Sequence, residues 1–227
     1  MHGSLVPALF ALAAFASVPV ASAHPVLAPS FAPRVAFDEG DEESAFIAGL
    51  AERGLHEMVV REATKFLDRR ARHPRAAAVR YRRASARYEL GAFDESLADY
   101  RALDRVDGFE QAAEVDFRIG QCSLELGKNE EAAAAFADVR KGDADYLHVP
   151  ASYLLGEALF RSGSFDEARA AYASVLKAEG KEAAEYAADA RYGVVWSAWK
   201  AREIEAAVAG ASEFVARHGD DPRTGEV

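Results

Sequence analysis

The sequence predicts an all-α fold built from stacked helical hairpins. Alanine, the residue with the highest helix propensity, is abundant along the chain. Gly91, Gly127 and Gly163 recur at intervals of 36 residues, and an acidic pair follows each of them. No segment shows the alternation of apolar and polar residues that a strand requires. A fixed interval of this length indicates a repeat architecture in which each repeat is one helical hairpin.

Residues 1–23 differ from the rest of the chain because they contain no Lys, Arg, Asp or Glu. An almost unbroken apolar run from Leu5 to Val20 precedes the small residues Ala21, Ser22 and Ala23. This pattern predicts a secretory signal peptide that is cleaved before His24. A membrane anchor is the alternative, but the run is short for a span and lacks flanking basic residues.

Residues 24–40 contain three prolines and no helical periodicity, which predicts an extended leader. The only cysteine, Cys122, lies far from the expected cleavage point. The mature chain would therefore have no cysteine for lipid attachment there and no intrachain disulfide. We expect a periplasmic protein without a stable membrane anchor after cleavage.

The three central repeats share side-chain sizes at fixed distances from their glycines. A small residue stands seven positions before each glycine and another five after it, and an aromatic residue stands nine after it. These residues are Ala84, Ser96 and Tyr100, then Gly120, Ala132 and Phe136, then Gly156, Ala168 and Tyr172. Antiparallel helices approach closely only where both carry small side chains, and the large residues fill the space between hairpins.

Two less regular copies flank the central three, with turns at Gly54 and near Arg202. Phe66 and Phe214 in these copies each precede a proline by eight residues. Irregular ends are expected because a terminal repeat faces solvent on one side. The expected repeats span about 41–74, 75–107, 110–142, 147–180 and 184–222. Residues 223–227 would form a tail that could be truncated.

From about residue 41 to 222, this pattern resembles the tetratricopeptide repeat (TPR) family. The closing phrases from Lys65 to Pro74 and from Glu213 to His218 are similar to exported envelope members, such as the Tol-Pal coordinator and the repeat subunit of the outer-membrane assembly machine. The chain lacks the coiled coil of the first and the lipid-attachment cysteine of the second. The resemblance implies a right-handed α-solenoid of about five hairpins, whose first helices line a concave groove.

Aromatic residues fill seven of the eight groove positions that the resemblance implies, which lie about ten and three residues before each turn. The first position holds Tyr81, Phe117, Tyr153 and Tyr192, the second holds Tyr88, Leu124, Phe160 and Trp199, and Trp196 lies on the same helix as the last pair. A row of aromatic rings suits an extended peptide or a partner helix. The alternative is that the rings only pack against neighbouring hairpins.

Charge is unevenly distributed along the chain. Basic residues outnumber acidic ones between residues 61 and 106, and Arg80, Arg82, Arg83 and Arg87 lie on one predicted helix. They could dock an acidic segment or a carboxylate, or simply form a solvated face. The formal net charge of −10 argues against nucleic-acid binding, because phosphate neutralisation needs clustered positive charge.

No sequence motif for catalysis, metal binding or cofactor binding is present, so we expect a non-catalytic protein without metal or cofactor. Cys122, close to Gly120, is expected to be a buried filler. The leading hypothesis is a periplasmic scaffold that binds a protein or peptide of the cell envelope. The alternative is a non-catalytic domain of a larger envelope enzyme or secretion complex. An array without a polar capping helix could also self-associate end to end.

Overall fold

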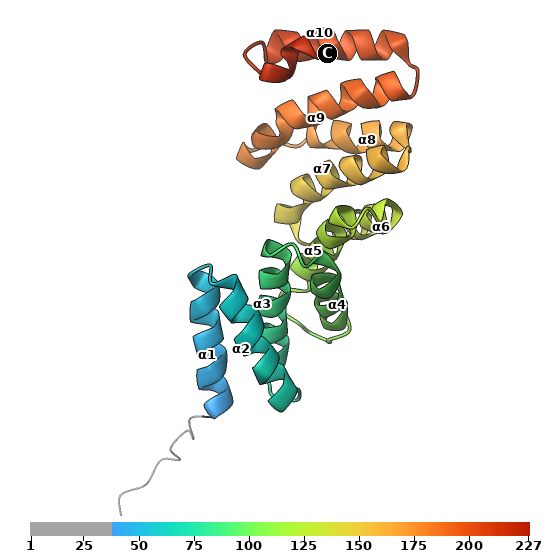
Figure 1. Ribbon diagram of the computed structural model, residues 1–227. Coiled ribbons are helices and arrows are strands. Elements are labelled where there is room, and N and C mark those ends of the chain that lie inside the picture. The colour runs from blue at the N-terminus through green and yellow to red at the C-terminus, as the bar shows by residue number, and fades with distance from the viewer. Residues whose placement is uncertain (1–37) are drawn as a thin grey trace, which may run out of the picture. The chain divides into compact units, whose positions relative to one another are not determined.

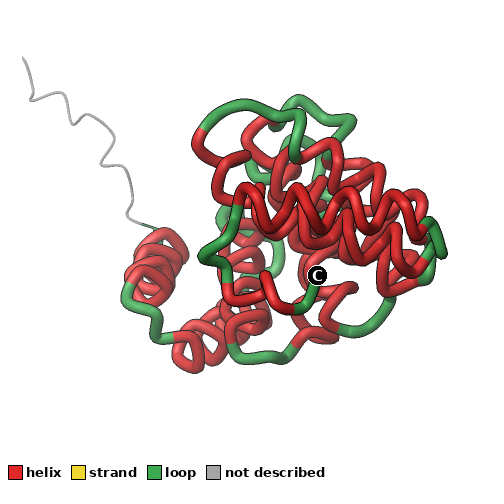
Figure 2. The backbone as a smooth tube through the Cα atoms, turned by 90° about the horizontal axis from the view of Figure 1, so that it is seen from above, coloured by secondary structure: helices red, strands yellow, loops and turns green. Residues whose placement is uncertain are grey.

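Ten α-helices follow one another along residues 38–227, the part of the chain that the computed structural model describes (Figure 1). They are α1 (Glu39–Glu52), α2 (His56–Arg69), α3 (Ala76–Glu89), α4 (Phe93–Leu103), α5 (Ala112–Glu125), α6 (Asn129–Val139), α7 (Asp145–Ser162), α8 (Phe165–Val175), α9 (Lys181–Lys200) and α10 (Ile204–Arg217). A short 3-10 helix, η1 (Pro222–Gly225), comes after them. These residues contain no strand (Figure 2), so the all-α prediction is confirmed.

The predicted signal peptide lies outside the described residues, as does the predicted leader before Asp38. Helix α1 begins at Glu39, two residues before the expected start of the first repeat. The Asp38 carboxylate accepts a hydrogen bond of 2.9 Å from the backbone N–H of Gly40, and so caps this helix. Three carboxylates in the first turn of α1 add a favourable interaction with the helix dipole.

Each odd-numbered helix forms a hairpin with the helix that follows it, and each hairpin packs on the next (Figure 1). The five hairpins form the predicted α-solenoid. First helices also contact one another across the intervening second helix, α1 with α3, α5 with α7, and α7 with α9. In a stack of hairpins, the layer whose helices reach each other in this way lies on the inner side. The first helices therefore form the inner layer, where the groove is expected.

All five hairpin turns have the same backbone geometry. A residue with positive φ ends each first helix, at +67° for Gly54, +74° for Gly91, +69° for Gly127, +86° for Gly163 and +64° for Arg202. The next backbone N–H then bonds to the carbonyl five residues earlier, as in Lys128 to Ser123 at 2.8 Å. This closure satisfies helix carbonyls that would otherwise lack a partner. The predicted turn near Arg202 is confirmed.

The glycines inside the first helices allow aromatic rings to touch the helix backbone. A Cβ added to Gly120 would lie 2.7 Å from the Phe136 ring, and one added to Gly156 would lie 2.6 Å from the Tyr172 ring. Both rings are buried. Each of these large residues therefore packs on the small residue of its own hairpin, a contact that the sequence pattern had not assigned to them.

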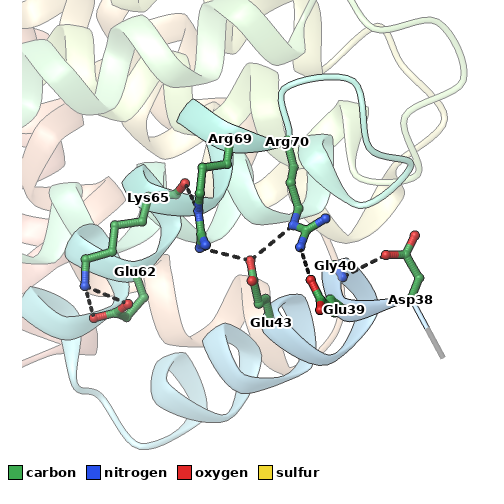
Figure 3. Close-up of polar contacts among 8 residues, drawn as sticks. All are labelled: Asp38, Glu39, Gly40, Glu43, Glu62, Lys65, Arg69 and Arg70. Atoms are coloured by element: carbon green, nitrogen blue, oxygen red, sulfur yellow. Dashed lines mark hydrogen bonds and ion pairs between the residues drawn. The ribbon is translucent and has the colours of Figure 1, made fainter.

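Ion pairs join the two helices of the first hairpin at its open end (Figure 3). Glu43 of α1 lies 3.2 Å from the Arg69 guanidinium and 3.4 Å from that of Arg70, and Arg70 also pairs with Glu39 at 2.9 Å. These pairs face solvent, so each contributes little to stability. They link the start of α1 to the end of α2.

Candidate functional site

The predicted groove residues lie on the first helices α3, α5, α7 and α9, and most are half-buried. In the first position, each ring packs on an aromatic ring of the second helix of the same hairpin. The centroid distances are 5.8 Å for Tyr81–Tyr100, 5.6 Å for Phe117–Phe136, 5.8 Å for Tyr153–Tyr172 and 6.0 Å for Tyr192–Phe214. The second helices thus support the aromatic row from beneath and hold each ring in place.

At the second groove position, the aromatic rings pack on residues near the hairpin turn instead. Tyr88 packs on Phe93 at 5.3 Å and Phe160 on Phe165 at 5.4 Å, and both partners stand just after the hairpin turn. Leu124 is only 6% exposed and joins the core cluster of the third and fourth hairpins. The groove position that the resemblance implied for Leu124 is therefore closed to a partner by core packing.

A hollow of about 360 Å³ opens between α7 and α9, with Tyr172 of α8 among its lining residues. Its other lining residues are Glu157, Phe160, Tyr192, Gly193, Trp196 and Lys200. Gly193 lets the α9 backbone pack against the buried Tyr172 ring, because a Cβ there would lie 2.6 Å from it. We call this site the aromatic hollow. Three predicted residues, Phe160, Tyr192 and Trp196, come together in it.

Opposite charges line the aromatic hollow. The Tyr172 hydroxyl donates a hydrogen bond of 2.6 Å to the Glu157 carboxylate. Burial raises the pKa of Tyr172, and that of Tyr153 in the same cluster, so both phenols stay protonated. Lys200 is exposed at the opposite helix. The hollow can take an apolar side chain and bind polar groups of either charge beside it.

Sequence reasoning missed Glu157 and Lys200. Glu157 stands six residues before its turn, and Trp196 occupies the same position in the last repeat. A comparison of the repeats at this third position would have added Glu157 to the predicted groove, because Trp196 in the next repeat was already predicted to lie there. Lys200 could have been added too, because it directly follows the predicted groove residue Trp199.

Trp199 is the most exposed residue of the predicted row, at 52%. Leu124 at the same repeat position is buried, because the first helix of the next hairpin packs against it. Within residues 38–227 no further first helix follows α9, and so Trp199 stays open. It lines a second pocket of about 320 Å³ together with Val208 and Ala211 of α10.

Two of the predicted docking arginines bind a buried carboxylate of their own hairpin. The Arg83 guanidinium donates two hydrogen bonds to Asp99, at 2.8 and 2.7 Å, and Arg87 donates another at 2.6 Å. Asp99 is only 4% exposed. Both guanidinium groups are therefore engaged in joining α3 to α4. Arg80 is half-buried and lies within ion-pair distance of no carboxylate in residues 38–227, so its docking role stays a prediction.

Cys122 is fully buried, as predicted, and burial raises the pKa of its thiol. Within residues 38–227, no three His, Cys, Asp or Glu side chains gather as metal ligands would. Over the same residues, no helix combines the length and apolar character that crossing a membrane would require.

A sequence-family model described as tetratricopeptide repeat matches residues 81–146, 117–184 and 153–222 in three overlapping copies. The chain belongs to the tetratricopeptide repeat family. The three copies cover the second to the fifth hairpins of this TPR array. No curated protein matches the sequence.

Solved TPR proteins share the fold at low sequence identity. MamA (residues 41 to the end) from Desulfovibrio magneticus RS-1 has a TM-score of 0.64 and 13% identity, covering 82% of this chain and 98% of its own. YrrB, a TPR protein with an unusual peptide-binding site, has a TM-score of 0.65 and 18% identity, covering 78% and 86%. PilF from Pseudomonas aeruginosa has a TM-score of 0.59 and 15% identity, covering 82% and 80%. TPR arrays generally act as scaffolds for protein interactions.

Proposed function

We propose that this TPR array is an exported, non-catalytic scaffold that binds a polypeptide segment along its first helices, anchored in the aromatic hollow. The proposal rests on the row of aromatic rings, each of which packs on a ring of the second helix of its hairpin. Each ring offers a large contact area, and because its rotamer is already fixed by packing, little conformational entropy is lost on binding. YrrB shows that a TPR array of similar fold can bind a peptide.

The aromatic hollow is where the partner would gain the most. Phe160, Tyr192 and Trp196 surround a space large enough for a bulky side chain, and Tyr172 and Glu157 provide hydrogen-bonding groups at its base. Buried aromatic anchors of this kind carry most of the binding energy in protein interfaces. The rest of the row would then orient the segment.

A peptide-display selection on the purified array tests this proposal. Selected peptides should lose at least tenfold in affinity for Trp196→Ala and Tyr192→Ala, because alanine removes the anchor contacts. Leu90→Ala is the matched control, since Leu90 is 46% exposed at the turn of another hairpin. Circular dichroism must show that all variants stay folded. Peptides that bind both hollow variants as well as the wild type would refute the proposal.

Export is a separate part of the proposal and rests on residues 1–23. N-terminal sequencing of the protein from a periplasmic fraction should begin at His24. A protein that retains Met1 and stays in the cytoplasmic fraction would contradict export. It would leave the binding proposal unaffected.

A further inference from the structure

Glu157 is the only acidic residue that stands six positions before a hairpin turn. It lies four residues after Tyr153 and three before Phe160, so its carboxylate belongs to the same side of α7 as these two rings. The corresponding positions of the other four hairpins hold neutral residues, which are Ala48, Ser85, Gln121 and Trp196. The aromatic hollow is therefore the one place where this position brings a negative charge to the inner layer.

Packing within the hairpin does not require this charge. The second hairpin has a tyrosine in the same role, and there the hydroxyl groups of Ser85 and Tyr100 lie 2.9 Å apart. Glu157 does the same for Tyr172 at 2.6 Å. A neutral hydroxyl therefore satisfies the buried phenol equally well, whereas a carboxylate loses part of its hydration at this place. The fold alone gives no reason for an acid here.

One oxygen of Glu157 keeps its capacity to accept a hydrogen bond. Its Oε1 binds the Tyr172 hydroxyl, and its Oε2 accepts no hydrogen bond from any residue between 38 and 227. Nη2 of Arg161 lies 3.9 Å from Oε2, which is longer than a hydrogen bond. The Glu157 side chain is 30% exposed, so a donor from outside can reach it.

Three half-buried aromatic rings, those of Phe160, Tyr192 and Trp196, line the hollow together with this carboxylate. Their positions are fixed by packing, since Phe160 lies 5.4 Å from the Phe165 ring and Tyr192 lies 6.0 Å from the Trp196 ring. The face of an aromatic ring attracts a cation, most strongly where water is excluded. Rings and carboxylate together favour a cation with an apolar stem over an apolar side chain.

The positive groups near the hollow leave room for such a cation. Arg223 lies over the Tyr192 ring, 4.9 Å from its centroid, but its charge is paired with Asp189 at 2.8 Å. Lys200 lines the hollow, is exposed, and has no carboxylate within 4 Å in the described part of the chain. Because solvent and salt screen an exposed ammonium, it opposes a second cation only weakly.

We propose that the aromatic hollow binds an arginine or lysine side chain of the partner polypeptide, with the cation at Glu157 and the stem against Phe160 and Trp196. This inference rests on the proposed scaffold function and specifies the side chain that the hollow selects. Arginine suits it best, because a planar guanidinium can stack on a ring while it donates hydrogen bonds to a carboxylate.

Peptides selected on the array from a random library are the probe. Each should contain one arginine or lysine whose replacement costs the most affinity. Citrulline, which keeps the shape of arginine without its charge, should weaken binding roughly tenfold at that position. Glu157→Gln should remove most of this difference, and glutamine can still accept the Tyr172 hydrogen bond. Glu89→Gln is the matched control, because Glu89 is an exposed carboxylate of another hairpin and should change nothing.

Lys200→Gln gives a result of the opposite sign. Removing this like charge should strengthen the arginine peptide by about twofold and leave the citrulline peptide unchanged. Loss of fold cannot produce such a gain, so this variant separates charge recognition from damage to the structure.

The outcomes distinguish this inference from the scaffold function on which it rests. Peptides that need Trp196 but bind equally well with citrulline overturn the inference and leave the scaffold proposal standing. If no selected peptide needs Trp196, the scaffold proposal fails. A titration with N-acetyl-arginine amide, followed through the NMR signal of the Trp196 indole N–H, then decides the hollow by itself. A shift that Glu157→Gln abolishes supports the cation site, and an unchanged signal overturns it.

Discussion

Tyr172 shows how single residues set the spacing of the array. Its ring lies between two helix backbones, since a Cβ added to Gly156 of α7 or to Gly193 of α9 would lie 2.6 Å from it. Its hydroxyl reaches the Glu157 carboxylate in the aromatic hollow. One side chain therefore fixes three helices and forms part of the candidate site.

Gly156→Ala should destabilise the protein through this contact. Overpacking costs about 1–3 kcal/mol, more than the roughly 1 kcal/mol gained when alanine replaces a helix glycine. Thermal unfolding followed by circular dichroism should show a lower midpoint. Gly49→Ala in α1 is the control, because outside the local backbone of α1 nothing lies within 4 Å of its added Cβ, and it should raise the midpoint. Equal effects of the two substitutions would contradict the packing argument.

Arg202 is the only non-glycine residue with positive φ in residues 38–227. An L-residue in this conformation costs about 1–2 kcal/mol, and glycine costs about 0.4–1 kcal/mol through the entropy of the unfolded chain. Arg202→Gly should therefore stabilise the array by about 0.5–1 kcal/mol. Urea unfolding should show a higher midpoint with an unchanged m-value. The reciprocal change Gly163→Ala, at φ +86°, should lower it.

At the scale of helices, Asp99 of α4 binds arginines of α3, and one of these arginines also reaches α2. It binds Arg83 and Arg87, and Arg83 also donates a hydrogen bond of 3.2 Å to the Thr64 hydroxyl of α2. The Arg83 and Arg87 side chains are 13% and 21% exposed, so water screens their charges poorly. Removing one partner of such a network leaves the others buried without a counter-charge.

Asp99→Ala should therefore cost about 3–5 kcal/mol of unfolding free energy, measured by urea denaturation. Asp138→Ala is the control, because Asp138 pairs with Lys141 while 69% exposed, and the loss there should stay below about 1 kcal/mol. If Asp99→Ala proves as mild as the control, the arginines are free to bind a partner as the sequence suggested.

The hairpins could be predicted from the sequence because each depends on residues close together in the chain. The turn glycines, the small residue before them and the aromatic residue after them lie within one repeat. Even the turn near Arg202, which has no glycine, could be located from the spacing of the repeats. The roles of Arg83, Arg87 and Trp199 could not be predicted in this way. The arginines depend on rotamers that meet Asp99 across the hairpin, and Trp199 depends on whether a further helix covers it.

At the scale of the molecule, each described hairpin packs on its sequence neighbours, with a few contacts between successive first helices. Stability in such an array is a sum of local terms and nearest-neighbour interfaces. The aromatic hollow belongs to the fourth and fifth hairpins, and the Asp99 network belongs to the first and second. The two regions should respond to substitutions separately.

Native-state hydrogen exchange on Gly156→Ala can measure this independence. The lost packing around Tyr172 should lower the opening free energy of amides in α7, α8 and α9, because all three helices contact that ring. Amides in α1 and α2 lie in helices that do not pack against α7, α8 or α9, and should keep their protection. Asp99→Ala should give the opposite pattern, with the loss in α2, α3 and α4. A uniform decrease along residues 38–227 in both variants would mean that the array opens only as one cooperative unit, and that the site cannot loosen without global unfolding.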